Sequence, residues 1–254
     1  MDIYEDLQAF QPANEQEAAD RDLILSRLET DPAVFDRSSV AHMACSIWTV
    51  DPTFTKTLLV YHNIYDSWSW IGGHADGQAD LAAVALRELE EETGVHGARL
   101  VPCGPGNVLS CEVLTVDGHV KRGAYVSSHL HLNVTYLAVA DPAEHVRIKA
   151  DENSGVKWAK LDEAVALSSE PWIRERIYRK LIEKTRELAP HYAIKSKTDA
   201  DCAPPSQAYP PWEQDLTPYY RGCRHDGHRP SDDAAPHPPL GSRYRTQWTT
   251  ACCW

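Results

Sequence analysis

The sequence has no run of about 18 apolar residues, so it predicts no segment that spans a membrane. Its start, MDIYEDLQAF, is acidic and lacks the basic residues and apolar core of a secretory signal. Only 7 of the 254 residues are cysteine, and this odd number shows no spacing typical of a disulfide framework. These absences predict a protein of the reducing cytoplasm that is not held at a membrane.

Positive charge is also scarce. The chain has 25 Lys and Arg against 37 Asp and Glu, which gives a formal net charge of −12 at pH 7. A general nucleic-acid binder needs a basic face to meet the phosphates, so the composition argues against a nucleic-acid polymer as partner. A small phosphorylated substrate is still compatible, because a bound cation can reverse the local sign of the field.

The C-terminal part lacks the apolar residues of a folded core. From residue 191 onward it has two Leu, one Ile, no Val and no Phe, and most of the 17 prolines lie here. Such a segment buries too little apolar area to offset its ordering entropy. We therefore expect residues 189–254 to form a Pro-rich, disordered tail, or to reflect an altered reading frame. Its stretch CRHDGH holds Cys223, His225 and His228 but no fourth ligand at a known spacing, so it predicts no metal site.

Helix-like and strand-like segments alternate along the rest of the chain, and no internal repeat is visible. Helical patterns cover 14–28, 80–93, a segment from 162 and 171–188, and strand patterns cover 41–50, 57–62, 129–140 and 156–161. Interleaved strands and helices give an α/β class. The expected domains are a helical extension at 1–36, one domain at 37–188 and the tail.

The helix predicted at 80–93 ends in RELEEETG, an unusual concentration of charge. Glu88, Glu91 and Glu92 stand at positions i, i+3 and i+4, so they share one helix face. Like charges at this spacing destabilise a helix by roughly 0.2–0.5 kcal/mol per pair, and the negative end of the helix dipole adds to this. A divalent cation such as Mg²⁺ would reverse the effect by taking the carboxylate oxygens as ligands.

A charge run alone is more often a solvated helix face, but two neighbouring features favour a ligand site. The preceding segment at 72–77, GGHADG, brings three glycines, which let a backbone turn sharply or approach a ligand. Arg87 lies one turn before Glu91 and can orient that carboxylate. The combined pattern predicts a metal cradle bordered by a glycine loop.

From Gly73 to Val95 the sequence resembles the Nudix box. That motif is a Gly, five residues, a Glu, seven residues, and then Arg-Glu-aliphatic-x-Glu-Glu-x-Gly-aliphatic. Its second part is matched in full from Arg87 to Val95, and the spacing from Gly73 to Arg87 is also right. The wider context, over about residues 1–188, is similar to an uncharacterised bacterial branch of the Nudix hydrolases.

The first half of the motif is incomplete. Its first Glu falls at Ala79, with Asp76 and Asp80 on either side as candidate replacements, and the Pro that often precedes the glycines is Ile71. The departure at Ala79 favours an alternative interpretation, a catalytically weak or inactive Nudix-fold nucleotide sensor. The intact second half favours an enzyme.

The resemblance implies a Nudix-type α/β/α sandwich with a mixed sheet, and a hydrolase that cleaves a diphosphate bond in a nucleoside diphosphate linked to another group. It implies Mg²⁺ or Mn²⁺ as cofactor, an orienting role for Arg87, and a general base outside the motif. Glu152 is our candidate for that base, with an ordinary exposed loop glutamate as the other interpretation. Many relatives form dimers, so a homodimer through the helix at 14–28 is also open. The predicted site comprises Gly72, Gly73, Arg87, Glu88, Glu91, Glu92 and Glu152.

Two smaller questions stay open at this point. A diphosphate isomerase on the same fold, resembling isopentenyl-diphosphate isomerase, would need a catalytic cysteine, and the spacing of Cys45 and Cys111 singles out neither. In the long predicted strand, His129, His131 and Asn133 share one face. The sequence leaves open whether this face contacts substrate, solvent or another element.

Overall fold

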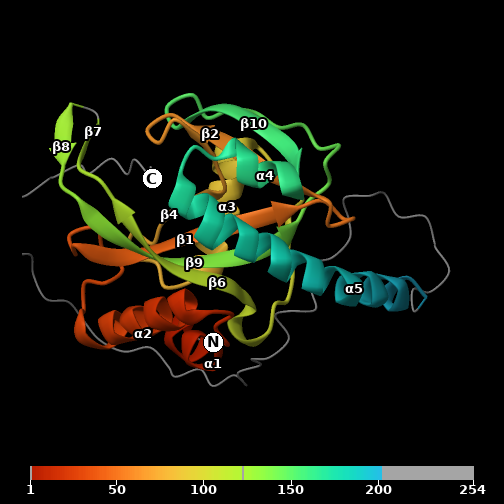
Figure 1. The fold of residues 1–254 in the computed structure, drawn as a ribbon, viewed down its shortest axis with the longest axis horizontal. Coiled ribbons are helices and arrows are strands. Elements are labelled where there is room, and N and C mark those ends of the chain that lie inside the picture. Colours follow the sequence, from red (N-terminus) through yellow and green to blue (C-terminus); the bar gives the residue numbers. More distant parts are fainter. Residues whose placement is uncertain (1, 122, 202–254) are drawn as a thin grey trace, which may run out of the picture. The chain divides into compact units, whose positions relative to one another are not determined.

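A mixed eight-stranded sheet forms the centre of the protein (Figure 1). The computed structural model describes residues 2–121 and 123–201, and the described residues up to Ser196 belong to one compact unit. The strands of the sheet are β1 (Ala41–Val50), β2 (Lys56–His62), β3 (Ser67–Ser69), β4 (Ile71–His74), β5 (Arg99–Leu100), β6 (Val108–Val116), β9 (His129–Val139) and β10 (Asn153–Lys160).

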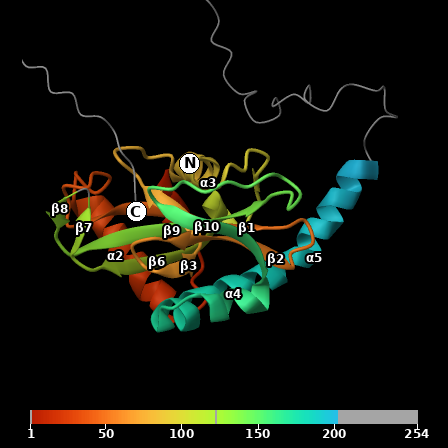
Figure 2. The same cartoon turned by 90° about the horizontal axis from the view of Figure 1, so that it is seen from above.

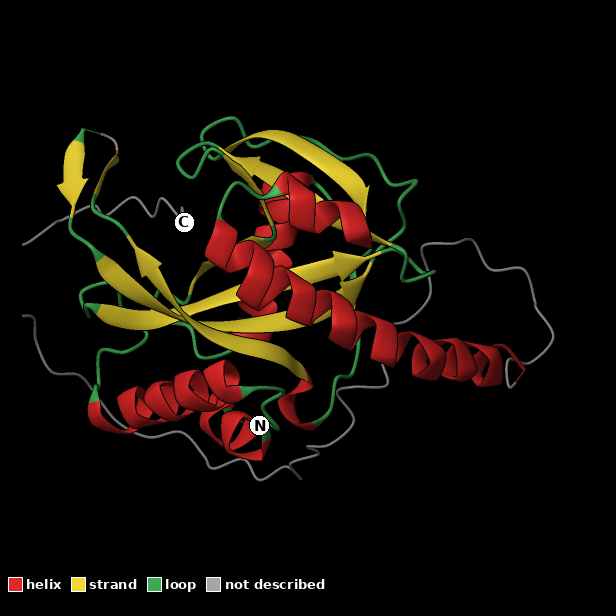
Figure 3. Cartoon of the chain, in the orientation of Figure 1, coloured by secondary structure: helices red, strands yellow, loops and turns green. Residues whose placement is uncertain are grey.

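The sheet order is β10-β2-β1-β9-β5, while β3 pairs with β2, β4 with β1, and β6 with β9. The central pair β1 and β9 is parallel, and the other pairs are antiparallel. A separate hairpin of β7 (His119–Lys121) and β8 (Ala124–Val126) extends from the connection between β6 and β9 (Figure 3).

Helices cover both faces of the sheet (Figure 2). One apolar cluster joins the sheet to α1 (Ile3–Ala9), α2 (Glu15–Thr30) and α3 (Leu81–Thr93), and a second joins it to the C-terminal helices. The C-terminal elements are α4 (Leu161–Leu167), the π-helical segment η2 (Ile173–Tyr178) and α5 (Arg179–Asp201), and a 3-10 turn, η1 (Pro105–Asn107), precedes β6. This arrangement confirms the α/β/α sandwich with a mixed sheet.

The predicted elements correspond to α2, α3, β1, β2, β9, β10 and the C-terminal helices. Helix α2 is capped by Asn14, whose Oδ1 atom accepts a hydrogen bond of 2.9 Å from the Glu17 backbone N–H. No helix among the described residues is both long and apolar enough to cross a membrane. The assignment of residues 1–36 as a separate extension stays a prediction.

The predicted end of the last helix near Leu188 is wrong. Helix α5 continues through Pro190 to Asp201, although a proline in a helix interior removes a hydrogen bond and is unfavourable. Tertiary packing holds the helix on both sides of Pro190, since Leu188 and Tyr192 pack on the second apolar cluster and the centroid of the Tyr192 ring lies 5.0 Å from that of Phe54. The rest of the expected tail, with the CRHDGH stretch, lies outside the described residues.

Candidate active site

Helix α3 is capped at both ends and packs against the sheet along one side. The Asp80 carboxylate accepts from the Ala83 backbone N–H at 3.0 Å, and Gly94 ends the helix in the left-handed conformation at a φ of 76°. Its apolar stripe, including Leu81 and Leu89, is buried against the sheet. These contacts fix where the carboxylates of RELEEETG lie.

The carboxylate face of α3 is largely buried, so its interpretation as a solvated face is wrong. Glu88 is 2% exposed and Glu92 is 3% exposed, whereas the Glu91 side chain is 39% exposed. Burying charged carboxylates is strongly unfavourable unless they are paired, hydrogen-bonded or bound to a cation. The helix therefore carries two carboxylates in the interior and a third at its edge.

The glycines before α3 are part of a strand, which corrects the expected loop. Gly72 and Gly73 lie in β4 and pair with β1. A Cβ atom at Gly73 would lie 2.5 Å from the Glu88 Cδ atom, so only glycine lets β4 pass this carboxylate. Gly77, at a φ of 82°, then makes the turn toward the helix.

Two cations border the carboxylates. The Arg87 guanidinium lies 3.4 Å from Glu88 Oε1 and 3.7 Å from Glu91 Oε1, and it also donates to Gln78. The Lys149 ammonium lies 3.3 Å from Glu91 Oε2. The predicted pairing of Arg87 with Glu91 is thus present, whereas Lys149 had no signal in the sequence.

Glu152 lies in this site and is not an exposed loop residue. Its carboxylate is 2.9 Å from Lys149 Nζ and its side chain is 6% exposed. The neighbouring Asn153 side chain donates to the Glu92 backbone carbonyl at 3.0 Å, which ties this loop to the end of α3. The Asn153 side-chain oxygen also accepts a hydrogen bond from the Lys149 backbone N–H at 3.2 Å. Sequence reasoning missed Asn153, because it belongs to no motif.

The negative charges of the carboxylates in the site repel one another. Burial, and then the charge of Glu91, raise the pKa of Glu88 to about 7. Burial, followed by the charges of Glu152 and Glu88, raises the pKa of Glu92 well above its usual range. Burial alone would lower the pKa of Lys149, but hydrogen bonds and ion pairs with Glu152 and Glu91 outweigh it and raise that pKa.

This set of groups fits a divalent cation. Glu92 Oε1 is buried and has no hydrogen-bond partner among the described residues. Glu88, Glu91 and Glu152 supply further carboxylate oxygens nearby, and oxygen ligands are those that Mg²⁺ and Mn²⁺ prefer. A cation at this place would compensate the charge that the protein itself leaves uncompensated.

Neither flanking aspartate replaces the missing glutamate of the motif directly. Ala79 is exposed at the start of α3. Asp76 forms an ion pair with Arg37, with an N–O distance of 2.7 Å, and Asp80 caps the helix. The cation site implied by this geometry therefore depends on the second half of the motif.

Glu92 and Gly72 also line a cavity. Its other walls come from β2 and β3, from β6 and β9, and from the C-terminal helices. They are formed by His62, Tyr65, Ser69, Trp70, Leu114, Thr115, Val116, His131, Glu170 and Ile173. The cavity thus places a buried carboxylate of α3 at the wall of a mostly apolar pocket, as small-molecule sites commonly do.

The raised pKa of Glu88 predicts a pH dependence of stability. In metal-free buffer with a chelator, we expect the free energy of unfolding of the wild type to fall, relative to that of Glu88→Gln, as pH rises from 4.5 to about 7. In this window the folded state binds more protons than the unfolded state, because the folded pKa of about 7 exceeds the usual 4.5. The difference should reach about 3 kcal/mol in denaturant titrations.

Glu90→Gln is the matched control for this measurement. Glu90 lies on the same helix but pairs with His96 at the exposed surface, where ion pairs contribute little. Its stability should follow that of the wild type across the window. If Glu88→Gln also follows the wild type, Glu88 is not a proton-binding group in the folded state.

Comparisons with known proteins identify the family of the chain. A model of the NUDIX domain matches residues 41–181, which is more than half of the chain. No curated protein matched it. Similar solved structures include a NUDIX-family hydrolase from Clostridium perfringens, with 18% identity, 58% of this chain and 97% of that chain covered, and a TM-score of 0.43.

A second similar structure is an Ap4A hydrolase from C. elegans, with 19% identity, 59% of this chain and 98% of that chain covered, and a TM-score of 0.41. A third is the E. coli dihydroneopterin triphosphate pyrophosphohydrolase, with 13% identity, 55% of this chain and 94% of that chain covered, and a TM-score of 0.43. The narrower assignment to a bacterial branch stays a prediction. From the family match over residues 41–181, the chain belongs to the Nudix family, whose hydrolases act on acid anhydrides in phosphorus-containing compounds.

Proposed function

We propose that the protein is a Mg²⁺- or Mn²⁺-dependent pyrophosphohydrolase that cleaves the diphosphate of a nucleoside diphosphate linked to another group. The observation that carries this proposal is the buried carboxylate cluster of α3, in which Glu88 and Glu92 lie together in the interior with raised pKa values. A fold gains no stability from such an arrangement unless a cation binds there.

The proposed ligands are Glu88, Glu91 and Glu92. When bound, the cations would neutralise the diphosphate, lower the pKa of a coordinated water and stabilise the charge on the leaving phosphate. Arg87 contacts Glu88 and Glu91, and so orients two of these ligands. We assign no catalytic step to Ala79.

Glu152 is the proposed general base. Its carboxylate is buried, and its charge raises the pKa of Glu92, so it lies beside the ligand set and can accept a proton from water there. Lys149 holds both Glu152 and Glu91 through ion pairs, which keeps the base positioned relative to the ligands. On the other side of the carboxylate site, the β4 backbone at Gly72 and Gly73 leaves space for the Glu88 side chain.

The test is hydrolysis by the full chain with and without Mg²⁺ or Mn²⁺. The substrates would be nucleoside triphosphates, nucleotide sugars, ADP-ribose, dinucleoside polyphosphates and NADH. We expect metal-dependent release of two phosphate-bearing products from at least one class. Glu91→Gln should lower this turnover at least roughly 100-fold, since ligand loss exceeds the effect of losing an outer-shell partner, while Glu90→Gln on the exposed side should not.

Other outcomes distinguish the alternatives. Tight nucleotide binding without turnover of any substrate would contradict the enzyme and leave the sensor, the interpretation that Ala79 favours. Isomerised product with no phosphate bond broken would identify an isomerase. The structure gives the latter little support, because Cys45 and Cys111 are buried and burial raises the pKa of both thiols.

A further inference from the structure

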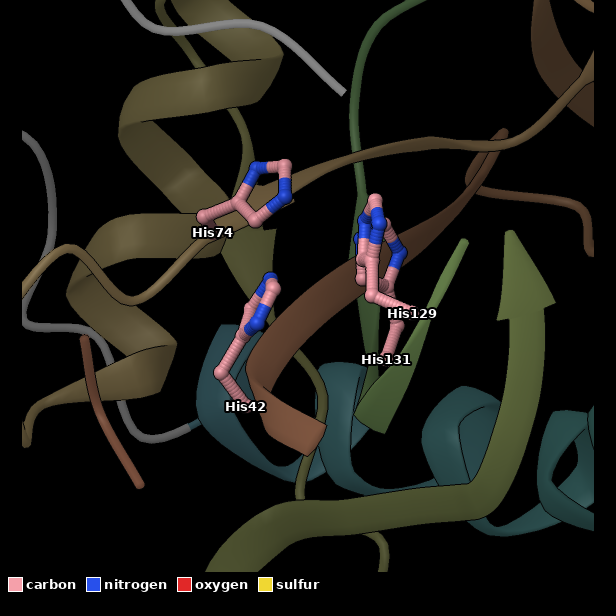
Figure 4. Close-up of side chains that lie close together, drawn as sticks. All are labelled: His42, His74, His129 and His131. Atoms are coloured by element: carbon pink, nitrogen blue, oxygen red, sulfur yellow. The ribbon is translucent and has the colours of Figure 1, made fainter. Parts of the chain in front are cut away.

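Four histidines from three strands lie close together (Figure 4), and none of them belongs to the carboxylate cluster. His42 comes from β1, His74 from β4, and His129 and His131 from β9. One ring nitrogen from each lies within 4.8 Å of the corresponding nitrogens of the other three. His42, His74 and His131 are buried, and His129 is partly buried.

Two of the rings are held in the tautomer that binds a metal. The Nδ1 atom of His42 lies 2.7 Å from the Ser39 carbonyl oxygen, and that of His129 lies 2.9 Å from the Ser127 carbonyl oxygen. A carbonyl only accepts, so both Nδ1 atoms carry the proton and both neutral rings present an Nε2 lone pair. A backbone carbonyl on the distal nitrogen is the usual outer-shell partner of a metal-bound histidine.

The distances between the ring nitrogens also suit a cation. His129 Nε2 and His131 Nε2 are 3.1 Å apart. Two nitrogens bound to one tetrahedral Zn²⁺ at about 2.0–2.1 Å lie about 3.3 Å from each other. This pair therefore already has the separation of two ligands of one ion, and the ligand nitrogens of the other two rings lie within 4.8 Å of it.

One lone pair in this group is buried without a partner. His42 is 3% exposed, and its Nε2 atom has no hydrogen-bond partner among the described residues. Leaving such an atom unsatisfied is unfavourable by roughly 1–3 kcal/mol. The strand register maintains this arrangement, since His42 is directly opposite His131 in the parallel β1–β9 pair.

We propose that His42, His74, His129 and His131 bind one zinc-class transition-metal ion in tetrahedral geometry, at a site separate from the Glu88, Glu91 and Glu92 ligands. Four imidazoles suit Zn²⁺, Cu²⁺ or Ni²⁺ and are poor ligands for Mg²⁺. The cluster borders a cavity lined also by Arg37, Ser38, Ser39, Val126 and Ser128, which gives the ion a route of entry.

The ion has a structural role in this proposal. It would link β1, β4 and β9 through side chains, and β4 carries the glycines that form one wall of the carboxylate site. Four protein ligands leave no open position, as in structural zinc sites. Binding should therefore raise the thermal stability of the protein whether or not a substrate is present.

The experiment uses the untagged, full-length protein after treatment with a chelator. Zn²⁺ is titrated by calorimetry in excess Mg²⁺, which occupies carboxylates but not imidazoles, and Tm is measured alongside. We expect one Zn²⁺ per chain and a higher Tm. His129→Gln and His42→Gln should weaken binding at least about 100-fold, beyond the loss of an outer-shell partner. Co²⁺ added in place of Zn²⁺ should give the absorption spectrum of a tetrahedral complex.

Two variants serve as matched controls. His119 has its ring centroid 6.4 Å from that of His129 but is not in the cluster, so His119→Gln should bind Zn²⁺ like the wild type. A variant of Cys223, His225 and His228 should do the same. Unchanged affinity in both His129→Gln and His42→Gln, loss of binding only in the C-terminal variant, or an octahedral Co²⁺ spectrum would each overturn the proposal.

Discussion

Replacing Glu92 with Gln should strongly lower metal-dependent hydrolysis while making the metal-free protein more stable near pH 8. The carboxylate is 3% exposed, its Oε1 atom has no hydrogen-bond partner among the described residues, and the charges of Glu152 and Glu88 oppose its ionisation. Glutamine has the same shape without the charge. We expect turnover to fall roughly 100-fold or more and the free energy of unfolding to rise by about 1–3 kcal/mol.

The opposite signs of the two effects are what make this substitution informative. A residue with only a packing role would lose stability on substitution, and its activity would fall in proportion to the folded fraction. A cation ligand in a repulsive carboxylate set should instead gain stability as function is lost. Turnover and denaturant unfolding in chelator would be measured on the same preparations.

Glu90→Gln is again the matched control, since it removes one charge from the exposed side of α3. It should change neither turnover nor stability by much. Turnover of Glu92→Gln within threefold of the wild type would show that Glu92 is not a ligand. A loss of stability in Glu92→Gln would show that its carboxylate is compensated within the protein.

Replacing Lys180 with Met should destabilise the protein by roughly 3–5 kcal/mol, the range for breaking a buried ion pair. Lys180 Nζ lies 3.0 Å from Glu112 Oε1 and 3.2 Å from Glu17 Oε1, and both carboxylate side chains are fully buried. Methionine fills similar space but leaves Glu112 without its cation. Denaturant unfolding would measure the change in free energy.

This ion pair belongs to a buried polar network that joins α2, β6, β9 and α5. Lys184 holds Glu17 at 2.7 Å, while Asn133 donates to Glu112 at 3.0 Å. Burial alone would raise the pKa of Glu17, but Lys180 and Lys184 outweigh it and lower that pKa. Asn133 therefore belongs to this network, which answers the question left open for it by the sequence.

Two further variants separate the ion pair from general packing. Lys160 pairs with Glu163 at the exposed surface, so Lys160→Met should have an effect below about 1 kcal/mol. Adding Glu112→Gln to Lys180→Met should recover part of the stability, because Gln keeps an oxygen for Asn133 and removes the uncompensated charge. Equal effects of Lys180→Met and Lys160→Met would mean that the network does not stabilise the fold.

The sequence by itself determined the helix of RELEEETG and the common face of its three glutamates. These features depend on residues within one or two turns of each other, and a helix with 3.6 residues per turn fixes their geometry locally. The same holds for β1, β2 and β9, whose apolar and β-branched residues favour extended structure. The family resemblance and Arg87 followed from this local pattern.

Only the tertiary structure decided how these local pieces form a site. Glu88 is buried because β4 passes over α3 as a strand, although its glycines have a low strand propensity. Lys149 meets Glu91, a residue far from it in sequence, only because the loop before β10 folds back to the end of α3.

The histidine cluster and the extension of α5 were decided in the same way. The parallel pairing of β1 and β9 places His42 opposite His131, and no periodicity within either strand encodes that register. Packing of Tyr192 on Phe54 carries α5 past Pro190, against the local preference of proline. In each case contacts between distant segments contribute more free energy than local propensity does, which is why the sequence pattern alone did not show them.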